Sequence, residues 1–257
     1  MVIVYVPCRL KSSRLSEKAI RPIYGLTSIE RCLINAMAIP GIDKVILATS
    51  TNEEDDALES YTLGGKVEVT RGSENDVLSR FLPSIDKYNP EHIIRITGDC
   101  PLVSAELGSY LIQSHKDLNA DATFTLSKTA LGISLEIYRT SAVRKLRELF
   151  PKTEHSEYLV YYFMNNPNHF KLNILEAPDK FLRPWRLTLD EENDLELFNM
   201  IYEKLQVGER PVDFDEVIAF FEENPEAASH NANNVVKYRQ DQNLIDELKR
   251  STTWVEG

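Results

Sequence analysis

The stretch His92-Ile-Ile-Arg-Ile-Thr-Gly-Asp-Cys-Pro-Leu102 decides the fold class of this chain. Residues 92–96 are mostly apolar and β-branched, which is typical of a buried strand. A Gly-Asp-x-Pro turn follows, so the carboxylate of Asp99 is expected at the carboxyl end of that strand. Open α/β sheets bind ligands at this edge, and one carboxylate there is a common way to hold Mg²⁺ against a nucleotide phosphate.

The segments around this stretch alternate between strand and helix patterns. This alternation predicts βαβ units and a mostly parallel sheet. Expected strands are 2–6, 44–48, 67–70 and 92–96, and expected helices are 27–38, 52–63, 75–88 and 105–115. After residue 121 we predict a smaller mixed α+β region, with strands 122–125, 134–138, 171–176 and 186–189 and helices 141–149 and 154–164. Expected helices 190–205, 213–223 and 236–249 follow.

Length and composition favour a single α/β domain over residues 1–257. The net charge of −11 argues against non-specific binding to nucleic acid or to anionic membranes. Three scattered cysteines suit neither a disulfide framework nor a zinc site, and they fit a reducing cytoplasm. The sequence contains no apolar run long enough for a transmembrane helix, and residues 1–6 lack the basic start of a signal peptide. We therefore expect a cytoplasmic protein without membrane insertion.

The loop after the first expected strand, residues 7–18, concentrates positive charge in an acidic chain. It carries Arg9, Lys11, Arg14 and Lys18 at the ligand-binding edge. Such groups can clamp a triphosphate and stabilise a pyrophosphate leaving group. The alternative interpretation is a solvated basic loop.

Two acidic residues far apart in the sequence are candidate metal ligands. Asp99 alone reads equally well as a turn carboxylate, and Asp190 alone reads better as a helix N-cap. Taken together, they make one Mg²⁺ clamp plausible. The chain lacks a Walker loop, a Gly-x-Gly-x-x-Gly motif and an activated nucleophile, which weighs against a dinucleotide oxidoreductase.

The loop 71–80 follows the third expected strand and either caps its helix through Asp76 or reads a nucleotide base. Ser50, at the end of the second strand, is expected to share that task. Glu136 and His155 lie in the variable second half, where a lone histidine is more often structural than catalytic.

In this order the motifs resemble the cytidylyltransferase superfamily, the CMP-sugar synthetases of the spore coat polysaccharide and 3-deoxy-manno-octulosonate groups. The family opens with Ala-Arg-x-x-Ser-x-Arg-Leu-Pro-x-Lys; here Pro7 stands for its Ala and Ser16-Glu17 for its Pro-Gly. The matching residues are Arg9, Ser12 or Ser13, Arg14, Leu15 and Lys18, then 48–50, 71–81, 95–102, 154–155, 186–190 and 224–226.

The resemblance implies a three-layer nucleotide-diphospho-sugar transferase (GT-A-like) fold. Residues 120–180 would cover the acceptor and form a homodimer surface, and 208–257 would be a C-terminal helical segment. The implied reaction is CMP transfer from CTP to an acidic sugar or related anionic acceptor, such as a phosphonate, with release of pyrophosphate. The product would serve surface polysaccharide synthesis.

The implied site follows the motifs residue by residue. The implied catalytic residues are Arg9, Arg14, Lys18 and Asp99. The nucleotide would be bound by these four and also by Ser12, Ser13, Ser50, Arg71, Ser73 and Asp76. The acceptor would face Glu136, His155 and Arg186, and Mg²⁺ would be held by Asp99 and Asp190. Two alternatives stay open: a nucleotide-sugar-dependent glycosyltransferase, disfavoured because an Asp-x-Asp motif is missing at Asp99, and a catalytically impaired nucleotide-binding protein.

Overall fold

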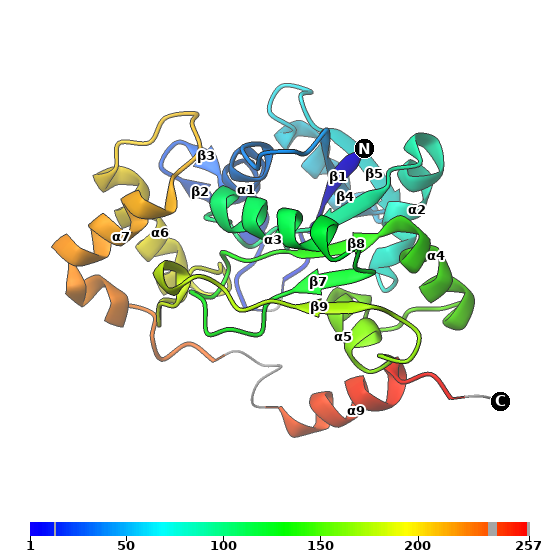
Figure 1. Cartoon of the computed structure of the whole chain (residues 1–257). Helices are drawn as coiled ribbons and strands as arrows, with labels where there is room; N and C mark the ends of the chain where they lie inside the picture. The colour runs from blue at the N-terminus through cyan, green and yellow to red at the C-terminus, as the bar shows by residue number, and fades with distance from the viewer. Residues whose placement is uncertain (13, 236–240, 256–257) are drawn as a thin grey trace.

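A seven-stranded sheet runs through the part of the chain that the computed structural model describes, residues 1–12, 14–235 and 241–255 (Figure 1). The strand order is β5-β4-β1-β6-β8-β7-β9. Only β8 pairs antiparallel with its neighbours, so the expected mostly parallel sheet is confirmed. The strands are β1 (Val2–Pro7), β4 (Lys44–Ser50), β5 (Glu68–Gly72), β6 (His92–Arg95), β7 (Ala122–Phe124), β8 (Glu136–Arg139) and β9 (Leu172–Ile174).

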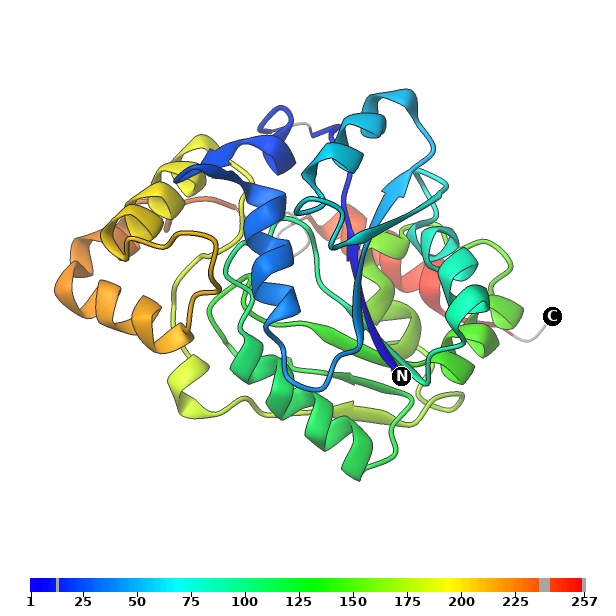
Figure 2. The ribbon, with the colours of Figure 1, turned by 90° about the horizontal axis from the view of Figure 1, so that it is seen from above.

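Helices cover both faces of this sheet, which gives the expected three layers. Figure 2 shows α1 and α3 on one side and α2 and α4 on the other. Helices α6 and α7 extend the first layer, and α5 extends the second. The α-helices are α1 (Ser28–Met37), α2 (Val77–Tyr88), α3 (Ala105–Asp117), α4 (Thr140–Leu149), α5 (Leu159–Met164), α6 (Glu192–Lys204), α7 (Phe214–Glu223) and α9 (Gln242–Thr252).

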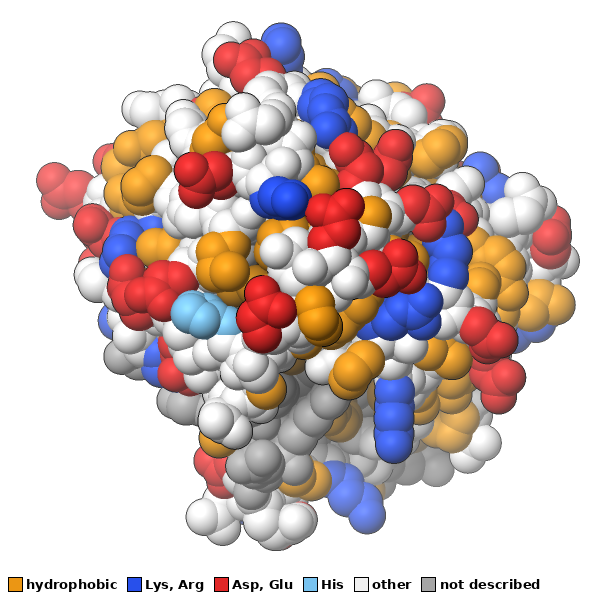
Figure 3. Space-filling model, turned by 90° about the vertical axis from the view of Figure 1, so that its left-hand side faces the viewer, with side chains coloured by type: hydrophobic (Ala, Val, Ile, Leu, Met, Phe, Trp, Pro, Cys, Tyr) orange, Lys and Arg blue, Asp and Glu red, His pale blue; other side chains and the backbone are white. Residues whose placement is uncertain are grey.

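Short elements connect these layers. A two-stranded sheet joins β2 (Pro22–Ile23) to β3 (Leu26–Thr27). The 3₁₀ turns are η1 (Lys18–Ile20), η2 (Glu53–Tyr61), η3 (Ser156–Tyr158), η4 (Asp179–Phe181) and η5 (Pro225–Ser229). None of the helices in the described residues is long and apolar enough to span a bilayer. On the face that carries α7, acidic and basic side chains are interspersed with apolar ones (Figure 3).

The strand pattern of β1 explains the two-sided core. Val2, Val4 and Val6 pack into the cluster beneath α1 and α3, whereas Ile3 and Tyr5 pack into the cluster beneath α2 and α4. Both sets are buried, because a parallel strand at the centre of a covered sheet has no solvent face. Its carboxyl end, and that of the adjacent β6, therefore open onto the same edge.

Several helix ends are confirmed and others are wrong. Thr27 and Glu30 form the expected capping box of α1, and Asp76 caps α2. In place of the expected helix over 52–63 there is the 3₁₀ helix η2 (Glu53–Tyr61). In place of the expected helix over 154–164, η3 begins only after the left-handed His155 and is followed by α5. The last helix begins at Gln242, and residues 236–240 of the expected helix 236–249 lie outside the described residues.

The expected strand over 186–189 is also wrong. Its alternating apolar pattern suits a strand, but Arg186 makes only an isolated bridge to Leu131. The segment instead donates the Leu189 N–H to the carbonyl of Asp99, at 2.8 Å. It is therefore an extended connection that crosses the end of β6 and brings the following acidic residues to the ligand-binding edge.

Candidate functional site

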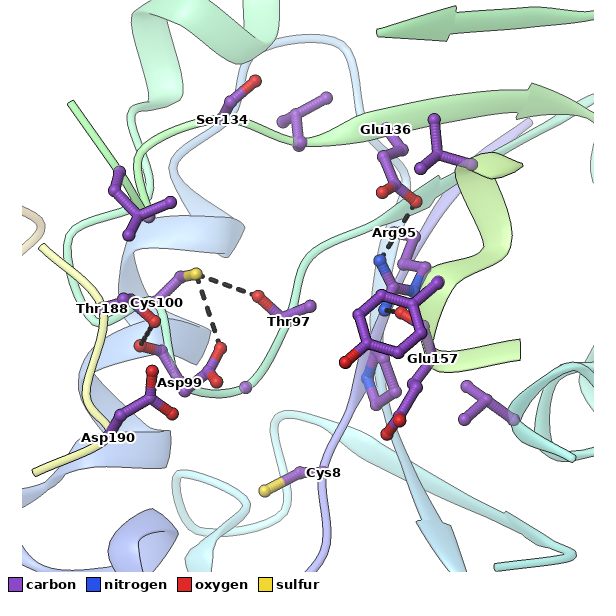
Figure 4. Close-up of a pocket in the computed structure, with 18 of the residues that line it drawn as sticks. Cys8, Arg95, Thr97, Asp99, Cys100, Ser134, Glu136, Glu157, Thr188 and Asp190 are labelled. Carbon is purple, nitrogen blue, oxygen red and sulfur yellow. Dashed lines mark hydrogen bonds and ion pairs between the residues drawn. The ribbon is translucent and has the colours of Figure 1, made fainter. Parts of the chain in front are cut away.

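A cavity of about 1010 Å³ opens at the carboxyl ends of β1 and β6. Loops after these strands form one side, and the segment between β7 and β8, together with η3 and α5, forms the other. In Figure 4, Asp99 and Asp190 lie on one side of the cavity, and Arg95, Glu136 and Glu157 lie on the opposite side. The cavity therefore has two halves with different chemistry.

Lys18 joins the two aspartates that the sequence singled out. Its Nζ lies 2.8 Å from Oδ2 of Asp99 and 2.9 Å from Oδ1 of Asp190. Arg14 adds a second cation 2.7 Å from the same Oδ1 of Asp190. The two carboxylates thus converge on one positive charge beside the basic loop, although 91 residues separate them in the chain.

Local packing explains why Asp99 reaches this point. A Cβ on Gly98 would lie 3.0 Å from Cβ of Cys8 and 3.1 Å from the carbonyl oxygen of Pro7. Glycine therefore lets the β6 loop approach the β1 loop closely. The Gly98 N–H donates to that carbonyl of Pro7, at 3.2 Å, and fixes the approach.

Asp190 is positioned from the other side by the first turn of α6. Glu191, and not Asp190 as expected, is the N-cap of this helix. The fully buried Asp194 accepts the backbone N–H of Asp190 at 2.9 Å and that of Glu191 at 3.0 Å. Arg186 connects the two aspartates through contacts of 2.8 Å to Asp190 and 2.9 Å to Asp194. Arg186 contacts Oδ2 of Asp190, and the other carboxylate oxygen, Oδ1, faces Lys18.

The electrostatics favour ionised groups at this junction. Burial on its own raises the pKa of Asp99, but the Lys18 ammonium and hydrogen bonds lower it to about 2. Burial likewise opposes the charge of Lys18, and the two aspartates outweigh it and raise its pKa. The neighbouring Cys8 thiol has a pKa raised by burial to about 12. The Asp99 carboxylate and the Lys18 ammonium are thus charged at neutral pH, while this thiol is neutral.

Further along the basic loop, a single glutamate neutralises two cations. Oε1 of Glu74 lies 3.2 Å from Nη1 of Arg9 and 3.3 Å from Nζ of Lys11. Asn52 holds the other oxygen of Glu74 at 3.0 Å, and Arg80 holds its backbone carbonyl at 2.7 Å. Glu74 lines the cavity, and its carboxylate therefore pairs with the same two cations, Arg9 and Lys11, that a bound phosphate would need.

The opposite half of the cavity contains a buried ion pair. Nη1 of Arg95 donates to Oε2 of Glu136 at 3.0 Å, and the hydroxyl of Tyr138 donates to the same oxygen at 2.7 Å. Arg95 also donates to the backbone carbonyl of Glu157, which ties η3 to the sheet. Burial lowers the pKa of Arg95, but the adjacent Glu136 carboxylate raises it by more, so the pKa of Arg95 lies above its ordinary value.

Not all expected site residues line this cavity. Lining residues are Arg9, Ser12, Lys18, Asp99, Glu136, Arg186 and Asp190, and Arg14 adjoins them through Asp190. Ser50, Arg71, Ser73, Asp76 and His155 are absent from the lining, and Ser13 lies outside the described residues.

These residues outside the lining have other partners. Ser50 hydrogen-bonds Asp55, and Arg71 pairs with Asp56 and Glu59. The Ser73 hydroxyl accepts backbone N–H groups of its own loop, which turns the chain into α2.

Asp76 and His155 likewise have partners away from the cavity. Asp76 pairs with Arg147 at 2.8 Å, and His155 Nε2 lies 3.0 Å from Oε1 of Glu247.

Neither Arg95 nor Glu74 was predicted from the sequence to have a role in the site. Arg95 is a charged residue in an otherwise apolar strand, and this contrast is the sequence feature that could have identified it as a site residue. Glu74 had no comparable signal, because its proximity to Arg9 depends on how two loops far apart in sequence meet.

Comparisons with known proteins agree with this geometry. The sequence model of the Cytidylyltransferase family matches residues 3–204. Spore coat polysaccharide biosynthesis protein SpsF of Bacillus subtilis is 34% identical over 236 residues, covering 89% of this chain and 97% of that protein. The 3-deoxy-manno-octulosonate cytidylyltransferase of Maricaulis maris is 27% identical over 52% of this chain and 51% of its own length.

Solved structures show the same fold. A cytidylyltransferase from Leptospira borgpetersenii matches with a TM-score of 0.76 at 23% identity, over 91% of this chain and 97% of that one. CMP:2-keto-3-deoxy-manno-octonic acid synthetase complexed with CTP matches with a TM-score of 0.60 at 16% identity, over 79% and 99%. With the family's motifs matched along residues 3–204, the chain belongs to the cytidylyltransferase family.

Proposed function

We propose that this protein transfers CMP from CTP to an anionic sugar acceptor and releases pyrophosphate, in the synthesis of a surface glycoconjugate precursor. The observation that carries the proposal is the convergence of Asp99, Asp190 and Lys18 at one end of a two-part cavity. The family and the relative named for spore coat polysaccharide biosynthesis support the reaction and its context.

In this mechanism an acceptor oxygen attacks the α-phosphorus of CTP, and the bond from that phosphorus to the pyrophosphate oxygen breaks. Arg9, Arg14 and Lys18 would hold the phosphates and stabilise charge on the departing pyrophosphate. No covalent enzyme intermediate is needed, because positioning and charge stabilisation suffice. Ser12 would add a hydroxyl to the phosphate side, and the loop with Arg71, Ser73 and Asp76 would order the base side together with Ser50.

The carboxylate pair fits Mg²⁺ by its donor chemistry. Mg²⁺ is usually bound by one or two carboxylates, with phosphates and waters as its other ligands. Asp99 and Asp190 supply two such carboxylates, both already facing one cation, the Lys18 ammonium. Among the described residues no larger cluster of His, Cys, Asp and Glu offers an all-protein site. Bound there, Mg²⁺ would offset phosphate charge.

The acceptor would occupy the half of the cavity lined by Glu136 and Arg95, with Arg186 at the boundary towards Asp190. Two large apolar residues are exposed in this region: Leu126, two residues after β7, has 57% of its surface exposed, and Ile174, in the edge strand β9, has 50%. We assign the homodimer surface to this part of residues 120–180 and expect a cytoplasmic location. Light scattering after size exclusion would give a molar mass twice that of the chain. The Leu126→Lys variant would give the mass of a single chain.

A pyrophosphate-release assay with each of the four nucleoside triphosphates and a panel of 3-deoxy-2-keto acids tests the proposed function. CTP with an acidic sugar is expected to release pyrophosphate only when Mg²⁺ is present. Asp99→Asn is expected to lower kcat by about 100-fold, because it removes a carboxylate that would hold Mg²⁺ and that positions Lys18 for the phosphates.

The same assay distinguishes the alternatives. Turnover that survives EDTA and the Asp99→Asn substitution would overturn the metal assignment. Release of a nucleoside diphosphate from a nucleotide sugar would identify a glycosyltransferase instead. Tight CTP binding without turnover on any acceptor would identify an impaired nucleotide-binding protein.

A further inference from the structure

The segment that follows η5, residues 230–234, lies against the start of α6. Asn193 Nδ2 donates to the carbonyl of His230 at 3.2 Å. Asn193 and Asn234 exchange amide hydrogen bonds of 3.0 Å and 2.6 Å. His230 Nε2 lies 2.8 Å from Oε2 of Glu196, one turn further along α6. Helix α7, which leads into η5, packs beside α6 (Figure 2). This segment is therefore fixed to the helix that follows Asp190.

Asn231 is the buried member of this segment, with only 2% of its surface exposed. Its Nδ2 donates to Oδ1 of Asp194 at 2.8 Å and to the backbone carbonyl of Arg186 at 3.0 Å. A carbonyl oxygen only accepts, and Oδ1 of Asp194 already accepts from Nε of Arg186 at 2.9 Å. The amide nitrogen of Asn231, and not its oxygen, therefore has to face both partners. Asn231 thus joins the extended connection 186–189 directly to α6.

The amide of Asn231 is not explained by stability alone. Its Oδ1 is buried, as is Nη1 of Arg186, and neither atom has a hydrogen-bond partner among the described residues. A buried polar atom without a partner destabilises a fold, and an apolar side chain at position 231 would avoid that loss. What the amide contributes here is its two donated hydrogen bonds, to Arg186 and to Asp194.

Asp194 transmits these hydrogen bonds to the cavity. Its Oδ2 accepts the backbone N–H of Asp190 at 2.9 Å, while its Oδ1 accepts from Asn231. Arg186, which Asn231 holds by its carbonyl, places Nη2 2.8 Å from Oδ2 of Asp190. The remaining oxygen, Oδ1 of Asp190, faces Lys18. Groups that hydrogen-bond the neighbours of a metal-binding carboxylate fix the direction of its oxygens.

We propose that Asn231 is a positioning residue, which orients the Asp190 carboxylate for a divalent cation through Asp194 and Arg186. This inference rests on the proposed function and adds a residue to its site. Asn231 does not line the cavity, so it acts only through other residues. It also lies beyond residue 204, where the match to the family's sequence model ends.

Calorimetry of CTP binding to the full-length protein, in Mg²⁺ and in EDTA and without an acceptor, tests this role apart from turnover. The wild-type protein is expected to bind CTP more tightly in Mg²⁺. Asn231→Ala is expected to weaken CTP binding in Mg²⁺ by about tenfold, the usual scale for residues that orient metal ligands. Binding in EDTA is expected to stay unchanged, because the basic loop is intact.

Two further variants separate donated hydrogen bonds from packing. Asn231→Asp keeps the shape of the side chain but turns an oxygen towards Asp194, and it is expected to lose at least as much Mg²⁺-dependent affinity as Asn231→Ala. Asn234→Ala is the milder variant, because half-buried Asn234 donates a single hydrogen bond to Asp194, at 3.0 Å. It is expected to show a smaller loss in the same direction.

Asn166→Ala is the matched control. Asn166 is 4% exposed, its Nδ2 donates to the carbonyls of Tyr162 and Thr252 at 2.7 Å each, and it does not line the cavity. It is expected to lower the Tm, as Asn231→Ala does, and to retain the Mg²⁺-dependent affinity. In an Asp190→Ala background, Asn231→Ala is expected to cause no further loss of that affinity.

The outcomes distinguish the inference from the proposed function. Wild-type affinity in Mg²⁺ for a folded Asn231→Ala or Asn231→Asp protein would overturn the inference alone, and so would a further loss in the Asp190→Ala background. Equal affinities of the wild-type protein for CTP in Mg²⁺ and in EDTA would overturn the metal assignment and the inference with it. Absence of CTP binding under both conditions would overturn the proposed function itself.

Discussion

At the scale of single residues, Glu74 is expected to compete with the phosphates of CTP for two cations of the basic loop. Its carboxylate lies 3.2 Å from Arg9 and 3.3 Å from Lys11, the cations that are expected to receive phosphate. These partners and Asn52 lower the pKa of Glu74, so the side chain is ionised at neutral pH. Glu74→Gln is therefore expected to lower the KM for CTP by about two- to fivefold, the range expected for losing one solvent-exposed ion pair.

Steady-state kinetics with varied CTP measure this effect. Glu223→Gln is the matched control, because Glu223 of α7 pairs with Lys204 of α6 at 3.3 Å, and neither residue lines the cavity. It is expected to leave the KM unchanged. A higher KM in Glu74→Gln would mean that the glutamate positions the loop for CTP and does not compete with it.

Glu17 gives a second prediction at this scale. It adopts a left-handed conformation, with φ of 49°, directly before Lys18 and where the family resemblance expects glycine. Left-handed backbone costs a residue with a Cβ roughly 1–2 kcal/mol, and a carboxylate here also repels phosphate. Glu17→Gly is expected to lower the KM for CTP by about two- to fivefold. Glu17→Gln separates charge from backbone: a KM equal to that of the wild type would assign the whole effect to backbone geometry.

At the scale of elements, the first turn of α6 is the support for Asp190. Asp194 is fully buried and accepts from Arg186 and from the backbone of Asp190. Asp194→Asn leaves a buried guanidinium with one carboxylate fewer, so the free energy of unfolding is expected to fall by about 3 kcal/mol. Activity should fall as well, because Asp190 loses its orientation.

Thr27→Ala is the comparison for this prediction, since it removes the capping box of α1, and neither Thr27 nor Glu30 lines the cavity. Urea unfolding is expected to show a loss of about 1 kcal/mol with kcat unchanged. If Asp194→Asn behaves in the same way as Thr27→Ala, the first turn of α6 supports the fold but not the site.

The elements also show what could be predicted from the sequence. Periodicity and caps placed the parallel strands and α1 to α3, because their signals are local. Residues 186–189 have the same alternation as a strand, yet the hydrogen bond from Leu189 to Asp99 comes from a distant loop. Asp99 and Lys18 were found by motif, whereas the contacts of Arg95 with Glu136 and of Glu74 with Arg9 are tertiary contacts that no local pattern encodes.

At the scale of the whole molecule, two buried histidines make folding sensitive to acid. His115 Nε2 lies 3.1 Å from Nδ1 of His92, and His115 Nδ1 lies 2.7 Å from the Thr123 hydroxyl. Burial, with a smaller contribution from the nearby Arg139, lowers the pKa of His115 to about 3. Burial and Arg139 also lower the pKa of His92, whereas Glu91 raises it by less. The folded chain thus keeps both rings neutral where the unfolded chain protonates them.

The sign of the resulting pH dependence follows from proton uptake. Between the unfolded pKa of 6.5 and the folded value of about 3, the unfolded state binds more protons, so stability falls as the pH falls. At pH 5 the loss for His115 is roughly 2 kcal/mol, since each pH unit below the unfolded pKa costs about 1.4 kcal/mol. The Asp99 carboxylate adds its own loss only as the pH falls from its ordinary pKa of 3.8 to its folded value of about 2. Urea unfolding at pH 7.5 and at pH 5 measures the difference in the free energy of unfolding between the two conditions. His115→Asn is expected to reduce this difference by at least half. An undiminished difference in the variant would place the acid sensitivity elsewhere in the fold.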